Sequence, residues 1–137
     1  MKITIEADTA ATPEQCWAAA TTPAAIMQWN AASPDWHCPS AEVDLKVGGR
    51  MSSRMEAKDG SMGFDFAATF TAVEAPRRLA YKLDDDRMVE LLLEPGAEGT
   101  HIRQTFDAET ENDPEMQRMG WQSILDSFAQ CAASQQV

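Results

Sequence analysis

Cysteine, positive charge and long apolar segments are all scarce in this sequence. The three cysteines, Cys16, Cys38 and Cys131, are an odd number and stand far apart. They form neither a CxxC pair nor a metal-ligand spacing, so we expect reduced thiols and no bound metal. No apolar run approaches the roughly 20 residues that cross a bilayer, and residues 1–8 hold no apolar segment of a signal peptide. The sequence therefore predicts a cytoplasmic protein.

The low content of positive charge excludes two classes of partner. Lys and Arg number 11 against 22 Asp and Glu, which gives a formal net charge of -11. A surface of this sign repels phosphate backbones and anionic lipids, so we expect no nucleic acid and no membrane partner. The 137 residues, 44% of them hydrophobic, suffice for one folded core. We predict a single domain over residues 1–137.

Established catalytic motifs are also missing. The sequence has no GxSxG or HExxH motif, no glycine-rich phosphate loop and no paired carboxylates on one helix turn. The nearest approach to a reactive cluster is Asp35, His37 and Cys38, whose spacing fits no metal motif. His101 alternates with Ile102 and should face solvent. We therefore predict no catalytic residue, no metal and no cofactor.

Alternation of apolar and polar residues is the strongest positive signal. It runs through residues 43–47, 50–57 and 62–72, with Gly48-Gly49 and Asp59-Gly60 between the runs. Side chains of a strand point to opposite faces in turn, so each run predicts one covered face and one wet face. Asp-Gly favours a hairpin turn, and the paired glycines favour a bend or bulge.

The rest of the sequence predicts three helices, a loop and four further strands. Thr12 and Pro13 begin a predicted helix, because Thr is a good cap and Pro suits the first helical turn. Asp113 and Pro114 begin another, which extends to about residue 133 with an apolar stripe on one side. The other predicted elements are a strand at 2–7, a short helix at 22–28, a loop at 30–40 and strands at 79–83, 89–93 and 100–106.

This order predicts an α+β protein of the helix-grip type. A meander of antiparallel strands twists and curves, and a straight helix touches a curved sheet over only part of its length. The rest of the interface is expected to leave a cavity that loops surround. We predict that the long last helix grips the covered face of the sheet.

Candidate ligand-binding residues follow from this geometry. Three indoles lie near the loop end or at the start of the last helix, where they either pack or form the rim of the cavity. Six further side chains point to the covered face, and one lies on the helix stripe. Tyr81 is the only tyrosine, and a buried phenol needs a hydrogen-bond partner. The predicted set is Trp29, Trp36, Met51, Met55, Phe64, Phe66, Tyr81, Leu91, Trp121 and Leu125.

Four motifs in their order resemble a known family. They are Ala11-x-Pro13-x-x-x-Trp17 with Thr22-Pro23-x-x-Ile26-x-x-Trp29, then Val43-Asp44-Leu45-Lys46-Val47-Gly48-Gly49, then Asp59-Gly60, and finally Gly120-Trp121-x-x-x-Leu125. Together they resemble the family named after the activator of the heat-shock protein 90 ATPase, within the START-like (SRPBCC) superfamily of helix-grip domains. Its members are mostly small bacterial proteins.

The resemblance implies a function based on the cavity. Proteins of the superfamily carry lipids, hormones and polyketides there, and a few branches use it for cyclisation or hydrolysis. We expect a small apolar molecule as the partner and a non-enzymatic carrier or sensor role, linked to stress. Two alternatives stay open, which are a contact with the chaperone and a small cyclase or hydrolase that uses Tyr81 or the pair Asp35 and His37.

Overall fold

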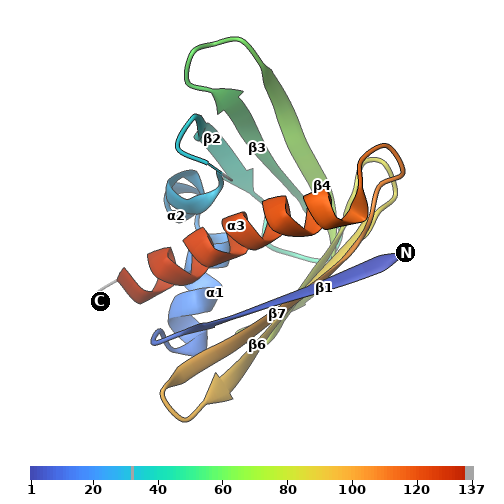
Figure 1. Cartoon of the computed structure of the whole chain (residues 1–137). Coiled ribbons are helices and arrows are strands. Elements are labelled where there is room, and N and C mark those ends of the chain that lie inside the picture. Colours follow the sequence, from blue (N-terminus) through green and yellow to red (C-terminus); the bar gives the residue numbers. More distant parts are fainter. Residues whose placement is uncertain (32, 135–137) are drawn as a thin grey trace.

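The computed structural model describes residues 1–31 and 33–134 of the chain. Residue 32, in the predicted loop, and residues 135–137, in the predicted domain, lie outside the described residues. Strands and helices follow one another in the predicted order, apart from the segment between α2 and β3 (Figure 1). They are β1 (Lys2–Thr9), α1 (Pro13–Thr21), α2 (Pro23–Trp29), β2 (Trp36–Val43), β3 (Arg50–Ala57), β4 (Gly63–Glu74), β5 (Arg78–Leu83), β6 (Met88–Gly96), β7 (Gly99–Asp107) and α3 (Pro114–Ser134).

The strands form one antiparallel sheet that bends around the last helix. The sheet has seven strands in the order β1-β7-β6-β5-β4-β3-β2, so all its hairpin neighbours pair directly and β1 joins at the far edge. Figure 1 shows α3 lying across the concave side of the sheet, with α1 and α2 beside its C-terminal half. The predicted helix-grip fold is confirmed. None of the helices in the described ranges combines the length and the apolar character that a bilayer crossing requires.

Local sequence signals account for the starts of the helices. The Gln15 amide N–H donates to Thr12 Oγ1 at 3.1 Å, and the Thr12 N–H donates to Gln15 Oε1 at 2.8 Å. This reciprocal capping box satisfies two N–H groups that the first turn of α1 leaves without helical partners. At α3, the Glu115 N–H donates to the Asp113 side chain at 2.8 Å.

The segment from residue 30 to residue 49 corrects two predictions. The predicted loop contains most of β2, which ends at Val43, and residues 44–47 of the predicted strand form a turn in which Leu45 is 40% exposed and Val47 66% exposed. The Lys46 N–H donates to Asp44 O at 2.9 Å and the Gly49 N–H to Lys46 O at 2.8 Å, so local bonds use the backbone that a strand would share. Gly48 adopts φ 86°, which favours glycine.

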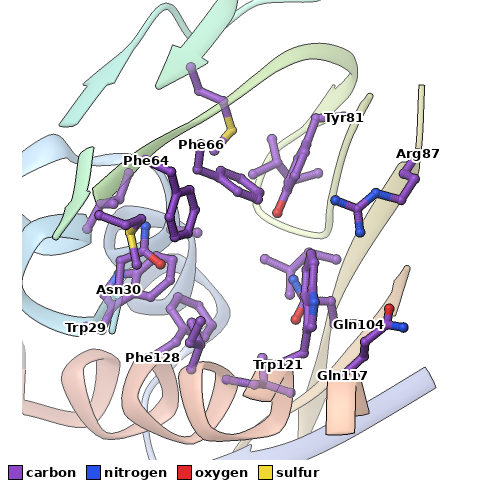
Figure 2. A pocket seen from close by; sticks show the side chains of 18 of the residues that line it. Trp29, Asn30, Phe64, Phe66, Tyr81, Arg87, Gln104, Gln117, Trp121 and Phe128 are labelled. Atoms are coloured by element: carbon purple, nitrogen blue, oxygen red, sulfur yellow. The ribbon is translucent and has the colours of Figure 1, made fainter. Parts of the chain in front are cut away.

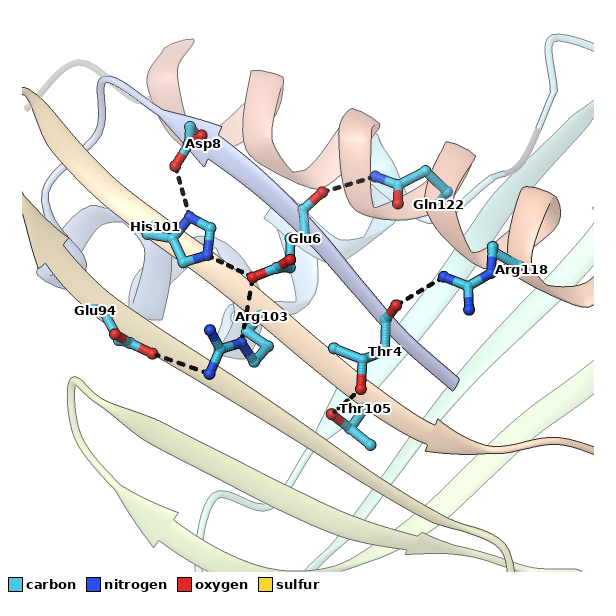
Figure 3. A network of polar contacts seen from close by, with 9 residues as sticks. All are labelled: Thr4, Glu6, Asp8, Glu94, His101, Arg103, Thr105, Arg118 and Gln122. Atoms are coloured by element: carbon cyan, nitrogen blue, oxygen red, sulfur yellow. Dashed lines mark hydrogen bonds and ion pairs between the residues drawn. The ribbon is translucent and has the colours of Figure 1, made fainter. Parts of the chain in front are cut away.

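Side chains of α3 attach the helix to the edge strand β1. Arg118 Nη1 donates to Thr4 O at 2.8 Å, and Gln122 Nε2 donates to Glu6 O at 3.0 Å (Figure 3). An edge strand normally presents carbonyls that another chain can pair with. Here side chains of α3 donate hydrogen bonds to two of those carbonyls. α3 therefore stands over one border of the sheet.

A polar network lies on the outer face of the same edge, where His101 was predicted to face away from the core. Its Nδ1 lies 2.7 Å from Asp8 Oδ1 and its Nε2 lies 2.9 Å from Glu6 Oε1 (Figure 3). Hydrogen bonds to Asp8 and Glu6 raise the pKa of His101 above 6.5, and the bond from His101 lowers the pKa of Glu6 below 4.5. The imidazolium form donates to both carboxylates.

This network predicts that His101→Gln destabilises the protein more at pH 5.5 than at pH 8.5. A raised histidine pKa contributes stability below the unfolded value near 6.5, and this contribution is lost as the pH rises through the folded value. The lowered pKa of Glu6 adds stability above about 4.5 that is lost as the pH falls further. Urea unfolding of both proteins at the two pH values measures the difference. His37→Gln is the control, because its nearest carboxylate lies 3.8 Å away at Glu56. An equal effect of His101→Gln at both pH values would contradict the network.

Candidate functional site

A cavity of about 350 Å³ lies between the concave face of the sheet and α3 (Figure 2). The backbone of α3 runs closest to β1, α1 and α2, so the helix stands away from the middle strands. Side chains from the sheet, from all three helices and from the connecting segments around Asn30, Arg87 and Glu109 line the resulting space. They are Ala20, Ile26, Trp29, Asn30, Met51, Met55, Phe64, Phe66, Leu79, Tyr81, Arg87, Leu91, Gln104, Glu109, Asn112, Gln117, Trp121, Ile124, Leu125 and Phe128.

Nearly all the predicted binding residues lie around this cavity. Those that line it are Trp29, Met51, Met55, Phe64, Phe66, Tyr81, Leu91, Trp121 and Leu125. Trp36 is the one member of the predicted set that is not among the lining residues. Trp36 begins the edge strand β2, and its ring meets that of Phe64 with centroids 6.0 Å apart. It therefore supports a lining residue without reaching the cavity.

Aromatic rings build two walls of the cavity. In one wall, Phe66 contacts both Tyr81 and Trp121 edge to face, with centroids 6.5 and 6.4 Å apart. In the other wall, the rings of Trp29 and Phe128 meet at 5.2 Å and 71°. Figure 2 shows Tyr81 and Trp121 across the open space from Trp29 and Phe128, with Phe64 and Phe66 next to each other between the two sides. Such rings present flat apolar surfaces to a guest.

Two polar groups of the predicted binding residues, the indole N–H of Trp29 and the phenol of Tyr81, already have hydrogen-bond partners inside the protein. The indole N–H of Trp29 donates to Ala19 O at 2.8 Å, so Trp29 offers a guest apolar surface and no donor. Burial raises the pKa of Tyr81 well above its usual value, and a hydrogen bond with Gln104 opposes part of that rise. The phenol thus stays protonated at neutral pH. A protonated, internally bonded phenol is a weak candidate for the base of a hydrolase.

The loop before α3 is tied to the helix by one buried amide. Gln117 Oε1 accepts the Glu109 N–H at 2.9 Å, and Gln117 Nε2 donates to Asn112 O at 2.8 Å. These bonds hold Glu109 and Asn112 at the cavity. Sequence reasoning missed all three residues, because a buried glutamine in an otherwise amphipathic helix carries no distinct sequence signal.

Two other residues that line the cavity, Gln104 and Arg87, were also missed, although the sequence pattern indicated their positions. Gln104 shares the covered face with Ile102 and Phe106, and a polar residue at such a position indicates a hydrogen-bonding role. Arg87 immediately precedes β6 and is in phase with the buried residues Val89 and Leu91. Alternation alone therefore directs the Arg87 side chain toward the covered face.

In the cluster of Asp35, His37 and Cys38, the structure separates the last two side chains. His37 and Cys38 are neighbours in β2, so their side chains point to opposite faces, and His37 is exposed while Cys38 is buried. Cys38 Sγ donates to Ser40 O at 3.3 Å. Within residues 1–31 and 33–134, no group of His, Cys, Asp and Glu has the arrangement of a metal site.

The fold and the cavity together define a helix-grip domain of the START-like kind. Residues 10–133 match the family model described as "Activator of Hsp90 ATPase homolog 1-like protein". The chain belongs to this family, as the resemblance implied.

Solved structures of bacterial proteins agree with this membership. The solution structure of an AHSA1-like protein from Aeromonas hydrophila is 50% identical over 96% of this chain and 91% of that one, with a TM-score of 0.90. A solution structure from Cytophaga hutchinsonii is 42% identical over 93% of this chain and 88% of that one, with a TM-score of 0.82. A crystal structure from Chromobacterium violaceum, at 22% identity and a TM-score of 0.85 over 97% and 98% of the two chains, shares the fold. None of the curated proteins matches this chain.

Proposed function

We propose that this protein binds a small apolar molecule in the cavity between its sheet and α3, and acts as a non-enzymatic carrier or sensor. The observation that carries the proposal is the aromatic cavity itself. Its volume of about 350 Å³ falls in the range of small-molecule sites, which is about 300–1,000 Å³. Apolar and aromatic side chains dominate its lining, with a small number of polar groups among them.

The proposed guest is flat and at least partly aromatic. The cavity is bounded by the wall of Phe66, Tyr81 and Trp121 on one side and by Trp29 and Phe128 on the other. A planar molecule between these walls gains edge or face contacts, each worth about 0.5–1.5 kcal/mol beyond the burial of area. A saturated chain fills the same space without those contacts.

Binding of N-phenyl-1-naphthylamine, a neutral fluorescent probe, tests the proposal. We expect its emission to rise on mixing and to saturate at one probe per chain. At a free concentration 100 times Kd, the probe stabilises the folded protein by about 2.7 kcal/mol, so the melting temperature rises by several degrees. A probe that neither saturates nor shifts the melting temperature would refute apolar guest binding.

The alternatives stay predictions. A chaperone contact is motivated by the family and by the net charge of -11, which suits a basic surface on a partner. A cyclase or hydrolase would have to use the same cavity. The protonated state of Tyr81 and the exposure of His37 favour the carrier or sensor over this enzyme.

A further inference from the structure

One charged side chain in the cavity has no role in the binding of a purely apolar guest. Arg87 is the single cation among the described residues that line the cavity. It follows the turn after β5 and precedes β6, in phase with the inward-facing Val89 and Leu91. Figure 2 shows its guanidinium pointing into the cavity from the side of Tyr81 and Gln104. Its side chain is only 26% exposed.

A single acid holds Arg87 in this position. Arg87 Nε donates to Asp85 Oδ2 at 2.8 Å, and the Arg87 backbone N–H donates to Asp85 Oδ1 at 3.2 Å. Within the described part of the chain, neither terminal nitrogen of the guanidinium has a hydrogen-bond partner. Asp85 therefore orients the guanidinium group of Arg87 and leaves its Nη1 and Nη2 available to a bound molecule.

The other polar groups of the cavity do not compete for those donors. The Tyr81 phenol and Gln104 interact with each other. Glu109 Oε1 accepts the Asn112 N–H at 3.0 Å and also the Asn112 side-chain amide, and the ion pairs of the described chain include none between Glu109 and Arg87. Arg87 thus presents two free donors and a positive charge next to an aromatic, partly water-excluded space. In such surroundings a charge-assisted bond is stronger than in bulk water.

We propose that the natural guest is an amphipathic organic acid, whose apolar ring system fills the cavity and whose carboxylate binds Nη1 and Nη2 of Arg87. This inference rests on the proposed function and specifies its ligand class. The planar guanidinium matches a carboxylate with two parallel hydrogen bonds. In a chain of net charge -11, Arg87 is also the group that offsets the general repulsion of an anion.

Two isosteric probes test this inference, namely 2-naphthoate and the neutral 2-naphthamide. Their Kd values are measured by calorimetry on the wild type, on Arg87→Gln and on Arg77→Gln. Arg77 is an exposed arginine outside the cavity lining, so it controls for the loss of one positive charge. We expect the wild type to bind 2-naphthoate at least about tenfold more tightly than 2-naphthamide, as a charge-assisted bond implies.

The variants assign this preference to one residue. Arg87→Gln should lose the tenfold preference and bind 2-naphthamide unchanged, whereas Arg77→Gln should keep it. Arg87→Lys keeps the charge without the two-pronged geometry and should retain only part of the preference. Equal binding of the two probes by the wild type, or an undiminished preference in Arg87→Gln, would overturn the inference. If 2-naphthamide and N-phenyl-1-naphthylamine still bind, the proposed function survives that result, and if no probe binds, both fall.

Discussion

Leu91→Trp is expected to weaken the binding of N-phenyl-1-naphthylamine by at least about tenfold while the protein stays folded. Leu91 lies on β6, opposite Leu79 on β5 and Gln104 on β7, and its buried side chain lines the cavity. A tryptophan at this position directs its extra volume into the space that the guest needs. Overpacking of a filled core costs about 1–3 kcal/mol, and existing space lowers that cost.

The neighbouring residue provides a matched control. Leu92 is on the same strand, but its side chain points to the opposite face of the sheet, away from the cavity. Leu92→Trp should leave the probe's Kd within about twofold of the wild type. Fluorescence titration gives both values, and chemical unfolding verifies that each variant is folded. Unchanged binding in a folded Leu91→Trp would place the guest elsewhere.

Phe106→Ala is expected to lower the free energy of unfolding by about 3–5 kcal/mol, the usual cost of removing a buried phenylalanine. Phe106 on β7 is completely buried. Its ring stacks on Trp121 of α3 with centroids 4.1 Å apart and planes 9° apart. The substitution removes core volume and the ring that fixes α3 on the sheet at the same time.

Phe64→Ala serves as the comparison for this loss. Phe64 also lines the cavity, but it is 50% exposed and lies on β4 near the hairpin turn. Its truncation should therefore cost far less stability. Urea unfolding followed by tryptophan fluorescence compares the two variants. Equal losses would mean that the stacked pair of Phe106 and Trp121 is not a major support of α3.

The sequence predicts the strands of the C-terminal half of the sheet well. In β5, β6 and β7 the alternation identifies the buried side, as Leu79, Leu91 and Ile102 show. The cap at Thr12 defines the start of α1 because its bonds are local. The same alternation correctly places the side chains of Tyr81 and Phe66 on the covered face, where they line the cavity.

The errors occur where non-local contacts decide the structure. Residues 44–47 alternate like a strand, but the chain turns there because Gly48 and Gly49 bond to Phe70 of β4. Trp36 was predicted at the cavity, and only the register of β2 on β3 shows that it lies at the edge. The position of Arg87 at the cavity was missed because a charged residue after three aspartates normally indicates a solvated turn. Its phase with Val89 was the available signal.

The account rests on an unfilled, guest-binding space between the sheet and α3. Its most direct test is an NMR titration of isotope-labelled protein with N-phenyl-1-naphthylamine, with nuclear Overhauser effects from the probe to assigned side chains. We predict effects to Leu91 and Ile124, which both line the cavity, and none to Leu92 on the outer face. Effects to outer-face residues alone would contradict the account.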